Sequence, residues 1–179
     1  MNSWKPDDDS KVRLKRYRIL RWSILQHYEV CRTPLLDVTH SLRIAASFVP
    51  RNNSNEGFLF VLGVPNLSGA ITASAEAGLQ IVRLASVCPS SAIRPHIQES
   101  YLLGEYPEIA EFRQKANYPH YEIDFGRRLV AKFRFEPTSF WEESKPDFSP
   151  ATDGALLPED DELLRLTETI RERFRAVGN

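Results

Sequence analysis

One short segment near the N-terminus concentrates side chains that can move protons or hold polar ligands. It reads LQHYEVCRTPLLDVTH, from Leu25 to His40. Within it His27 precedes Asp37, and the Thr-Pro pair between them is typical of a turn. If that turn folds back, the Asp37 carboxylate reaches the His27 imidazole and orients it, as general acid–base catalysis requires. The segment therefore predicts His27 and Asp37 as candidate catalytic residues.

The same side chains also have ordinary structural uses. His27 lies near the end of a predicted helix, where its ring can donate a hydrogen bond to a backbone carbonyl. Asp37 or Thr39 can accept from the first backbone N–H groups of a second predicted helix, over residues 39–48. The residues alone leave both interpretations open.

A second group of candidates lies in RPHIQESY, from Arg94 to Tyr101. The surrounding segment, 88–109, has three prolines and no sustained hydrophobic period, so we expect it to be mostly irregular. Long ordered loops in compact domains are often functional. Gln98 is a candidate ligand-binding residue, and Glu99 is a candidate to stabilise charge that develops on a ribose. The alternative is a solvated loop with scattered polar side chains.

The third feature is a basic run, KVRLKRYRILR, over residues 11–21. Six of these eleven residues are Lys or Arg. A helix with this composition can lie along phosphates, and we name Lys11, Lys15 and Arg18 as candidate nucleic-acid contacts. The alternative is a solvated helix face, which the formal net charge of −1 favours.

The bulk composition bounds the class of protein. The chain has 179 residues, 42% of them hydrophobic, which suits one ordinary globular domain. Its two cysteines, Cys31 and Cys88, form no zinc-type pair, so we expect no metal. No glycine-rich phosphate loop, GxSxG or HExxH motif occurs, and we expect no resident cofactor. No apolar run is long enough for a membrane helix, so we expect no membrane partner and a cytoplasmic location.

Hydrophobic periodicity predicts an α+β domain, with helices at both ends of the chain and a small central sheet. We expect residues 1–9 to be a polar leader before a domain over 10–179. The segment 65–78 is expected to be a loop or a short weak helix. The other predicted elements are helices over 10–30, 39–48, 108–116 and from 158 onward, a helical turn at 138–144, and strands over 58–64, 79–87 and 127–137.

The segment LQHYEVCRTPLLDVTHSLRIAASFV resembles the central motif of the FRG domain, a family found mostly in bacterial and phage proteins. That motif reads Gln-His-[Tyr/His]-Gly, a short link, Thr-[Arg/Pro]-Leu-Leu-Asp-[Trp/Phe]-Thr, and a small-residue helix that ends in Phe. RPHIQESYLL resembles a later segment of the family, and ALLPEDDELLRLTETI resembles its C-terminal Leu-[Phe/Tyr]-Pro-Asp-Leu-Asp helix. The residues that match the central motif are Gln26, His27, Tyr28, Thr33, Pro34, Leu35, Leu36, Asp37, Thr39, Leu42, Ala45 and Phe48.

This chain departs from the family pattern in three ways. It lacks the Phe-Arg-Gly triplet that precedes the Gln-His helix, Glu29 replaces the usual glycine, and Val38 replaces the usual aromatic residue. The family has no settled activity, so the resemblance implies a fold and a shared polar pocket more than a reaction. The residues implied to converge in that pocket are Gln26, His27, Asp37, Thr39 and Gln98.

Three functional hypotheses follow from these residues. The first is a pocket that binds a nucleotide or a nucleic-acid end, because His, Gln and Asp suit base edges and ribose hydroxyls. The second is a transferase or hydrolase of an NAD-type nucleotide, in which His27 and Tyr28 hold the nucleotide and Glu99 stabilises charge. The third is a non-catalytic interaction module that contacts a protein or nucleic-acid partner through the basic helix.

Overall fold

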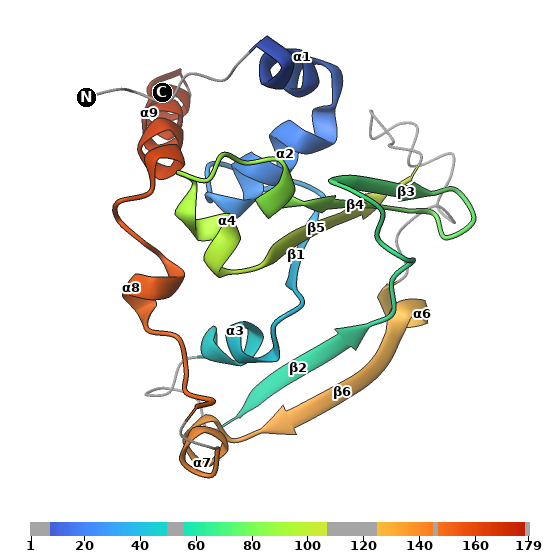
Figure 1. Ribbon diagram of the computed structural model, residues 1–179, viewed down its shortest axis with the longest axis vertical. Helices are drawn as coiled ribbons and strands as arrows, with labels where there is room; N and C mark the ends of the chain where they lie inside the picture. Colours follow the sequence, from blue (N-terminus) through green and yellow to red (C-terminus); the bar gives the residue numbers. More distant parts are fainter. Residues whose placement is uncertain (1–7, 50–55, 107–124, 145–146, 178–179) are drawn as a thin grey trace.

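In the computed structural model the residues described are 8–49, 56–106, 125–144 and 147–177. They form the α+β fold that the sequence predicts (Figure 1). One antiparallel sheet has the strand order β1-β5-β4-β3, and β2 pairs with β6 in a second, two-stranded sheet. In chain order the elements are α1 (Asp8–Arg16), α2 (Arg18–His27), β1 (Leu36–Thr39), α3 (Leu42–Ser47), β2 (Gly57–Leu62), β3 (Ile71–Ser74), β4 (Leu79–Arg83), the 3-10 helix η1 (Leu84–Ser86), α4 (Ile93–Ile97), β5 (Ser100–Glu105), α6 (Phe125–Arg128), β6 (Leu129–Phe135), α7 (Pro137–Glu142), α8 (Asp153–Leu156) and α9 (Glu162–Val177).

The predicted N-terminal helix over 10–30 is two helices in the structure. The chain breaks at Tyr17, which has an extended backbone with φ −106° and ψ 104°. The break leaves carbonyl groups at the end of α1 without helical partners. The Arg21 guanidinium donates to two of them, the Leu14 carbonyl and, at 2.9 Å, the Lys15 carbonyl. Hydrophobic periodicity continues across the break, which explains why one long helix was predicted.

The segment after the turn is a strand before it is a helix. β1 occupies 36–39, and α3 begins only at Leu42, capped by the Ser41 hydroxyl, which accepts from the Ile44 backbone N–H at 3.4 Å. The predicted start of this helix at 39 was therefore wrong, and Asp37 and Thr39 do not cap it. This placement removes the structural explanation for Asp37 that the sequence left open.

The largest error of the sequence prediction concerns β5. The segment expected to be irregular contains α4 and β5, and β5 pairs with β1 on one side and β4 on the other. β3 was also missed, since it falls within the segment 65–78 expected to be a loop or weak helix. The strand predicted over 79–87 ends at Arg83 and continues as η1. The strands predicted over 58–64 and 127–137 are confirmed as β2 and β6.

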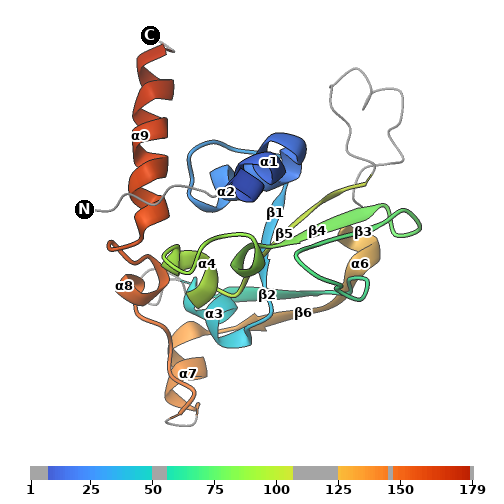
Figure 2. The same ribbon diagram turned by 45° about the horizontal axis from the view of Figure 1, so that its top comes forward.

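The two faces of the four-stranded sheet pack against different elements. Val82 and Leu102 lie opposite each other in the register and belong to a cluster that includes Ile19 and Leu20 of α2. On the other face, Leu103 belongs to a second cluster, and Leu62 at the end of β2 packs against that cluster. Figure 2 shows the sheet between α2 and the β2–β6 pair. Because opposite residues share a face, Asp37, which pairs with Leu102, lies on the α2 face.

The C-terminal helix was predicted from 158 onward and runs as α9 from Glu162. α8, at 153–156, precedes it within a segment expected to be a loop. The helical turn predicted at 138–144 is confirmed as α7. Residues 1–7 of the predicted leader and the helix predicted over 108–116 lie outside the described residues. In the described part of the chain, no helix combines the length and the apolar character needed to cross a membrane.

Candidate functional site

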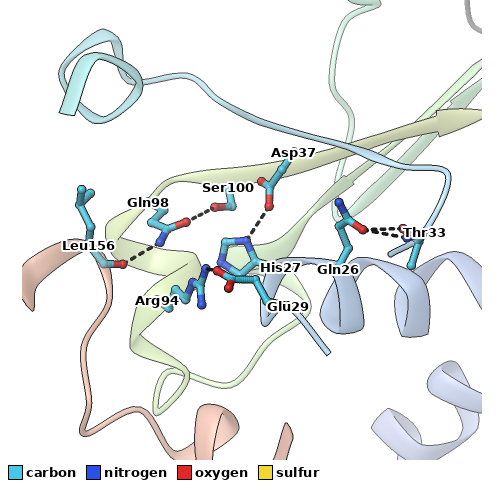
Figure 3. Close-up of polar contacts among 9 residues, drawn as sticks. All are labelled: Gln26, His27, Glu29, Thr33, Asp37, Arg94, Gln98, Ser100 and Leu156. Atoms are coloured by element: carbon cyan, nitrogen blue, oxygen red, sulfur yellow. Dashed lines mark hydrogen bonds and ion pairs between the residues drawn. The ribbon is translucent and has the colours of Figure 1, made fainter. Parts of the chain in front are cut away.

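The centre of the site is a contact between the two predicted catalytic residues. The Nδ1 atom of His27 lies 3.0 Å from the Oδ2 atom of Asp37 (Figure 3). His27 is the last residue of α2 and is 1% exposed, whereas the Asp37 side chain is 40% exposed on β1. An ionised carboxylate only accepts hydrogen bonds, so the Nδ1 atom carries the proton of this contact. The structure therefore brings the pair together across the turn.

The rest of the His27 ring is enclosed by protein. It packs nearly perpendicular to the Tyr28 ring, with centroids 5.5 Å apart and planes at 84°. Among the described residues, no hydrogen-bond partner lies within reach of its buried Nε2 atom. The open end of the pair is therefore the Asp37 carboxylate, and His27 holds that carboxylate in place rather than meeting solvent itself.

Asp37 opens onto a cavity of about 780 Å³. The cavity lies beside the edge strand β1, and α3, α4, β2 and β5 contribute residues to its walls. One part of the wall is apolar and includes three phenylalanines, and the other part is polar. The polar residues are Asp37, Thr39, Arg94, Gln98 and Ser100, and the phenylalanines are Phe48, Phe58 and Phe60.

Gln98 and Ser100 form a fixed polar patch in this wall. Gln98 is 4% exposed and donates through Nε2 to the Leu156 carbonyl at 2.6 Å. The Ser100 hydroxyl donates to the Gln98 Oε1 atom at 3.5 Å. Ser100 lies opposite Thr39 in the β1–β5 register, so both share the Asp37 face. The predicted convergence of Asp37, Thr39 and Gln98 is therefore present in the geometry.

Glu99 is oriented differently from its neighbours. It has a left-handed backbone with φ +47°, its side chain is exposed, and it is not among the residues that line the cavity. The left-handed residue turns the chain sharply between α4 and β5. This turn leaves the side chains of Gln98 and Ser100 inside. The structure does not bring Glu99 to the other candidate residues.

Gln26 and Tyr28 have structural contacts instead of places in the cavity wall. The Gln26 Oε1 atom accepts from the Thr33 backbone N–H at 2.8 Å and from its hydroxyl at 3.3 Å, which fixes the turn. Tyr28 is fully buried, and its hydroxyl donates to Asp161 at 2.9 Å. Burial, followed by the neighbouring Asp161 carboxylate, raises the pKa of Tyr28 far above its ordinary value. Tyr28 therefore stays a neutral donor.

Asp161 is a buried anchor that the sequence analysis missed. Its Oδ2 atom accepts from the Tyr28 hydroxyl and, at 2.8 Å, from the Arg94 backbone N–H. Its Oδ1 atom accepts from the backbone N–H groups of Leu163 and Leu164 at the start of α9. Asp161 thus ties the end of α2 and the start of α4 to α9. The available signal was its position at the final Asp of the C-terminal motif.

Arg94 is the second residue that the sequence analysis did not assign to the site. It lines the cavity, is 12% exposed, and pairs through Nη2 with the Glu29 Oε1 atom at 2.8 Å. Its presence in RPHIQESY was a signal, but its partner Glu29 lies far away in the sequence. Arg94 adds a positive charge to a cavity wall that otherwise contains Asp37 and neutral polar groups.

The basic run divides into residues with different surroundings. Lys11 and Lys15 are exposed on α1, while Arg18 is partly buried with its guanidinium 4.7 Å from the centre of the Trp22 ring. None of the three lines the cavity. In the described part of the chain, no group of three His, Cys, Asp or Glu side chains is arranged to hold a metal ion.

Comparisons with models of known families, with curated proteins and with solved structures find no match for this chain. The resemblance to the FRG domain therefore stays a prediction from the motif residues, and the site has to be interpreted from its own geometry.

Proposed function

We propose that this domain binds a nucleotide in the cavity beside β1, with a ribose hydroxyl donating to Asp37 and the base against the phenylalanine wall. The observation that carries the proposal is the Asp37 carboxylate, held at 3.0 Å by the buried His27 ring and open toward the cavity. Glu99, which the transferase hypothesis places at the ribose, lies outside the cavity wall. The proposal is therefore for binding and not for transfer.

The size and lining of the cavity suit this ligand class. Sites for small molecules usually enclose about 300–1,000 Å³ and combine apolar walls with a few placed polar groups. The cavity of about 780 Å³ falls in this range. A nucleoside has a flat apolar base and a ribose with adjacent hydroxyls, so it needs a wall of each kind.

The polar wall offers matching partners for a ribose. Asp37 has two carboxylate oxygens, and the contact with His27 occupies one direction of one of them. Ser100 and Thr39 add hydroxyl groups on the same face of the sheet. Because the Thr39 hydroxyl already accepts from the Ser41 backbone N–H at 3.1 Å, it is held in place to donate. These groups can form hydrogen bonds with a ribose, and an apolar ligand would leave them without partners.

The apolar wall offers a surface for the base. Phe58 and Phe60 are two residues apart on β2, so their side chains lie on one face of the strand. Both residues line the cavity, and the Lys132 ammonium lies 4.5 and 5.3 Å from the centres of their rings. Stacking of a base on an aromatic ring stabilises binding by about 1–3 kcal/mol.

Calorimetric titration with the four common ribonucleosides tests the proposal. We expect at least one to bind with a dissociation constant of about 1 mM or lower. Asp37→Asn should weaken that binding by about tenfold, because an amide replaces a charged acceptor. Glu76→Gln, a charge change in the exposed turn between β3 and β4, is the matched control. Absence of binding for all four ribonucleosides and for their 5′-monophosphates would refute the proposal.

The role of His27 is tested by its coupling to Asp37. If His27 acts by holding the carboxylate, His27→Gln should weaken nucleoside binding in the wild-type background and have little further effect in Asp37→Asn. Equal effects in both backgrounds would mean that His27 acts through the fold instead. Thermal unfolding of each variant separates a loss of folded protein from a loss of affinity.

A further inference from the structure

Arg94 is held in the cavity wall more firmly than a surface arginine. Its backbone N–H donates to the buried Asp161 carboxylate, and its guanidinium lies 5.7 Å from the centre of the Tyr28 ring. Its side chain is only 12% exposed. A cation fixed in this way at a cavity that takes a nucleotide is placed to meet an anionic group of the ligand.

The hydrogen-bonding capacity of Arg94 is only partly used. A guanidinium has five N–H donors in a planar fork. One Nη2 donor reaches Glu29, and no described residue offers an acceptor to the buried Nε atom. Figure 3 shows the Arg94 and Glu29 side chains meeting. The remaining Nη N–H groups can donate to a second, bidentate partner.

Glu29 is a weakly bound partner of Arg94. Its side chain is 70% exposed, and exposed ion pairs contribute little net stability. Its backbone lies in the left-handed region at φ +56°, which suits glycine better than glutamate. The chain thus holds a carboxylate on Arg94 from a strained and solvated position.

We propose that Arg94 is the phosphate-binding residue of the cavity, and that Glu29 is an internal carboxylate which the ligand phosphate displaces. This inference rests on the proposed nucleotide binding and names the part of the ligand that Arg94 recognises. A phosphate carries more negative charge than a carboxylate and bonds an arginine fork in the same bidentate geometry. Breaking the exposed Arg94–Glu29 pair therefore costs little free energy, and Arg94 gains a stronger partner in the phosphate.

The proposal predicts opposite effects for the two members of the pair. The quantity to measure is the affinity ratio between a ribonucleoside 5′-monophosphate and its nucleoside, at one ionic strength. We expect a ratio of about ten in the wild-type protein. Arg94→Gln should bring the ratio close to one, and Arg94→Lys should leave an intermediate value because the charge remains but the fork is lost.

Glu29→Gln should raise the ratio about threefold or more, because the amide competes less well for the guanidinium. Glu76→Gln removes the same charge from the exposed β3–β4 turn and should leave the ratio unchanged. Glu29 is exposed, so this variant tests the proposal even if substitutions at Arg94 impair folding.

The outcomes separate the inference from the function on which it rests. Nucleosides that bind while the monophosphates bind no better would leave the proposed function standing and overturn the phosphate site. An unchanged ratio in Arg94→Gln would also overturn it. An unchanged ratio in Glu29→Gln would overturn the displacement of Glu29. Absence of binding for nucleosides and monophosphates alike would overturn both proposals.

Discussion

Replacing the buried Asp161 carboxylate should destabilise the whole domain. Four donors converge on it at 2.8 to 3.1 Å, two on each oxygen: the Tyr28 hydroxyl and three backbone N–H groups. Asp161→Asn replaces one oxygen with an NH₂ group, so two donors face another donor in either orientation of the amide. A hydrogen bond to a charged group is worth about 1.5–3 kcal/mol, and two losses come to about 3–6 kcal/mol.

That loss is large beside the ~5–15 kcal/mol by which typical domains are stable. Urea unfolding followed by circular dichroism measures it. Asp160→Asn, at the exposed neighbouring residue, is the matched control and should change the free energy of unfolding by less than about 0.5 kcal/mol. Tyr28→Phe removes only one of the four donors and should cost about 1–2 kcal/mol. If the free energy of unfolding of Asp161→Asn lay within about 0.5 kcal/mol of the wild-type value, Asp161 would not anchor α2, α4 and α9.

Three further predictions follow from individual side chains. Burial raises the pKa of the Cys88 thiol to about 12, so iodoacetamide should label the exposed Cys31 in folded protein, and Cys88 only after denaturation, by mass spectrometry. The pKa of Glu136 is lowered to about 2, chiefly by the hydrogen bond that its side chain accepts from the Ser139 backbone N–H. The stability difference between wild type and Glu136→Ala should therefore be present above about pH 4.5 and vanish as the pH falls toward 2, in urea titrations. Glu99→Gly should raise the free energy of unfolding by about 0.5–1 kcal/mol, since φ is +47°, and a decrease would contradict the strain.

The sequence was sufficient for the fold class and for the identity of the central pair, but not for its geometry. His27 and Asp37 were predicted either to face each other or to satisfy their own backbones. The edge strand formed by residues 36–39 decides between the two arrangements, because it places Asp37 against His27. A strand of four residues has too little alternation to be told from the start of a helix, and its pairing partner β5 is distant in the sequence.

β5 itself was hidden for a physical reason. Its sequence, SYLLGE, is a short apolar run buried on both faces, and periodicity cannot separate such a run from a helix or a loop. The prolines around it strengthened the expectation of irregular structure. Without β5, the predicted chain had nothing to place Asp37 on the same face as Ser100.

The Arg94–Glu29 ion pair could not be predicted from the sequence because it depends on the backbone conformation of Glu29. Glu29 reaches Arg94 from a left-handed position that glutamate rarely adopts. Nothing in the local pattern indicates this conformation apart from the glycine at the same place in the FRG motif. The cavity is also a product of tertiary structure, since its walls come from segments that no local pattern brings together.

We propose above that the Asp37 carboxylate, held by His27, binds a ribose hydroxyl. The most direct measurement is the affinity ratio between a ribonucleoside and its 2′,3′-dideoxy counterpart, in wild type and in Asp37→Asn. We predict a ratio of about ten or more in the wild type that falls close to one in the variant. A ratio that is the same in both proteins would contradict the claim.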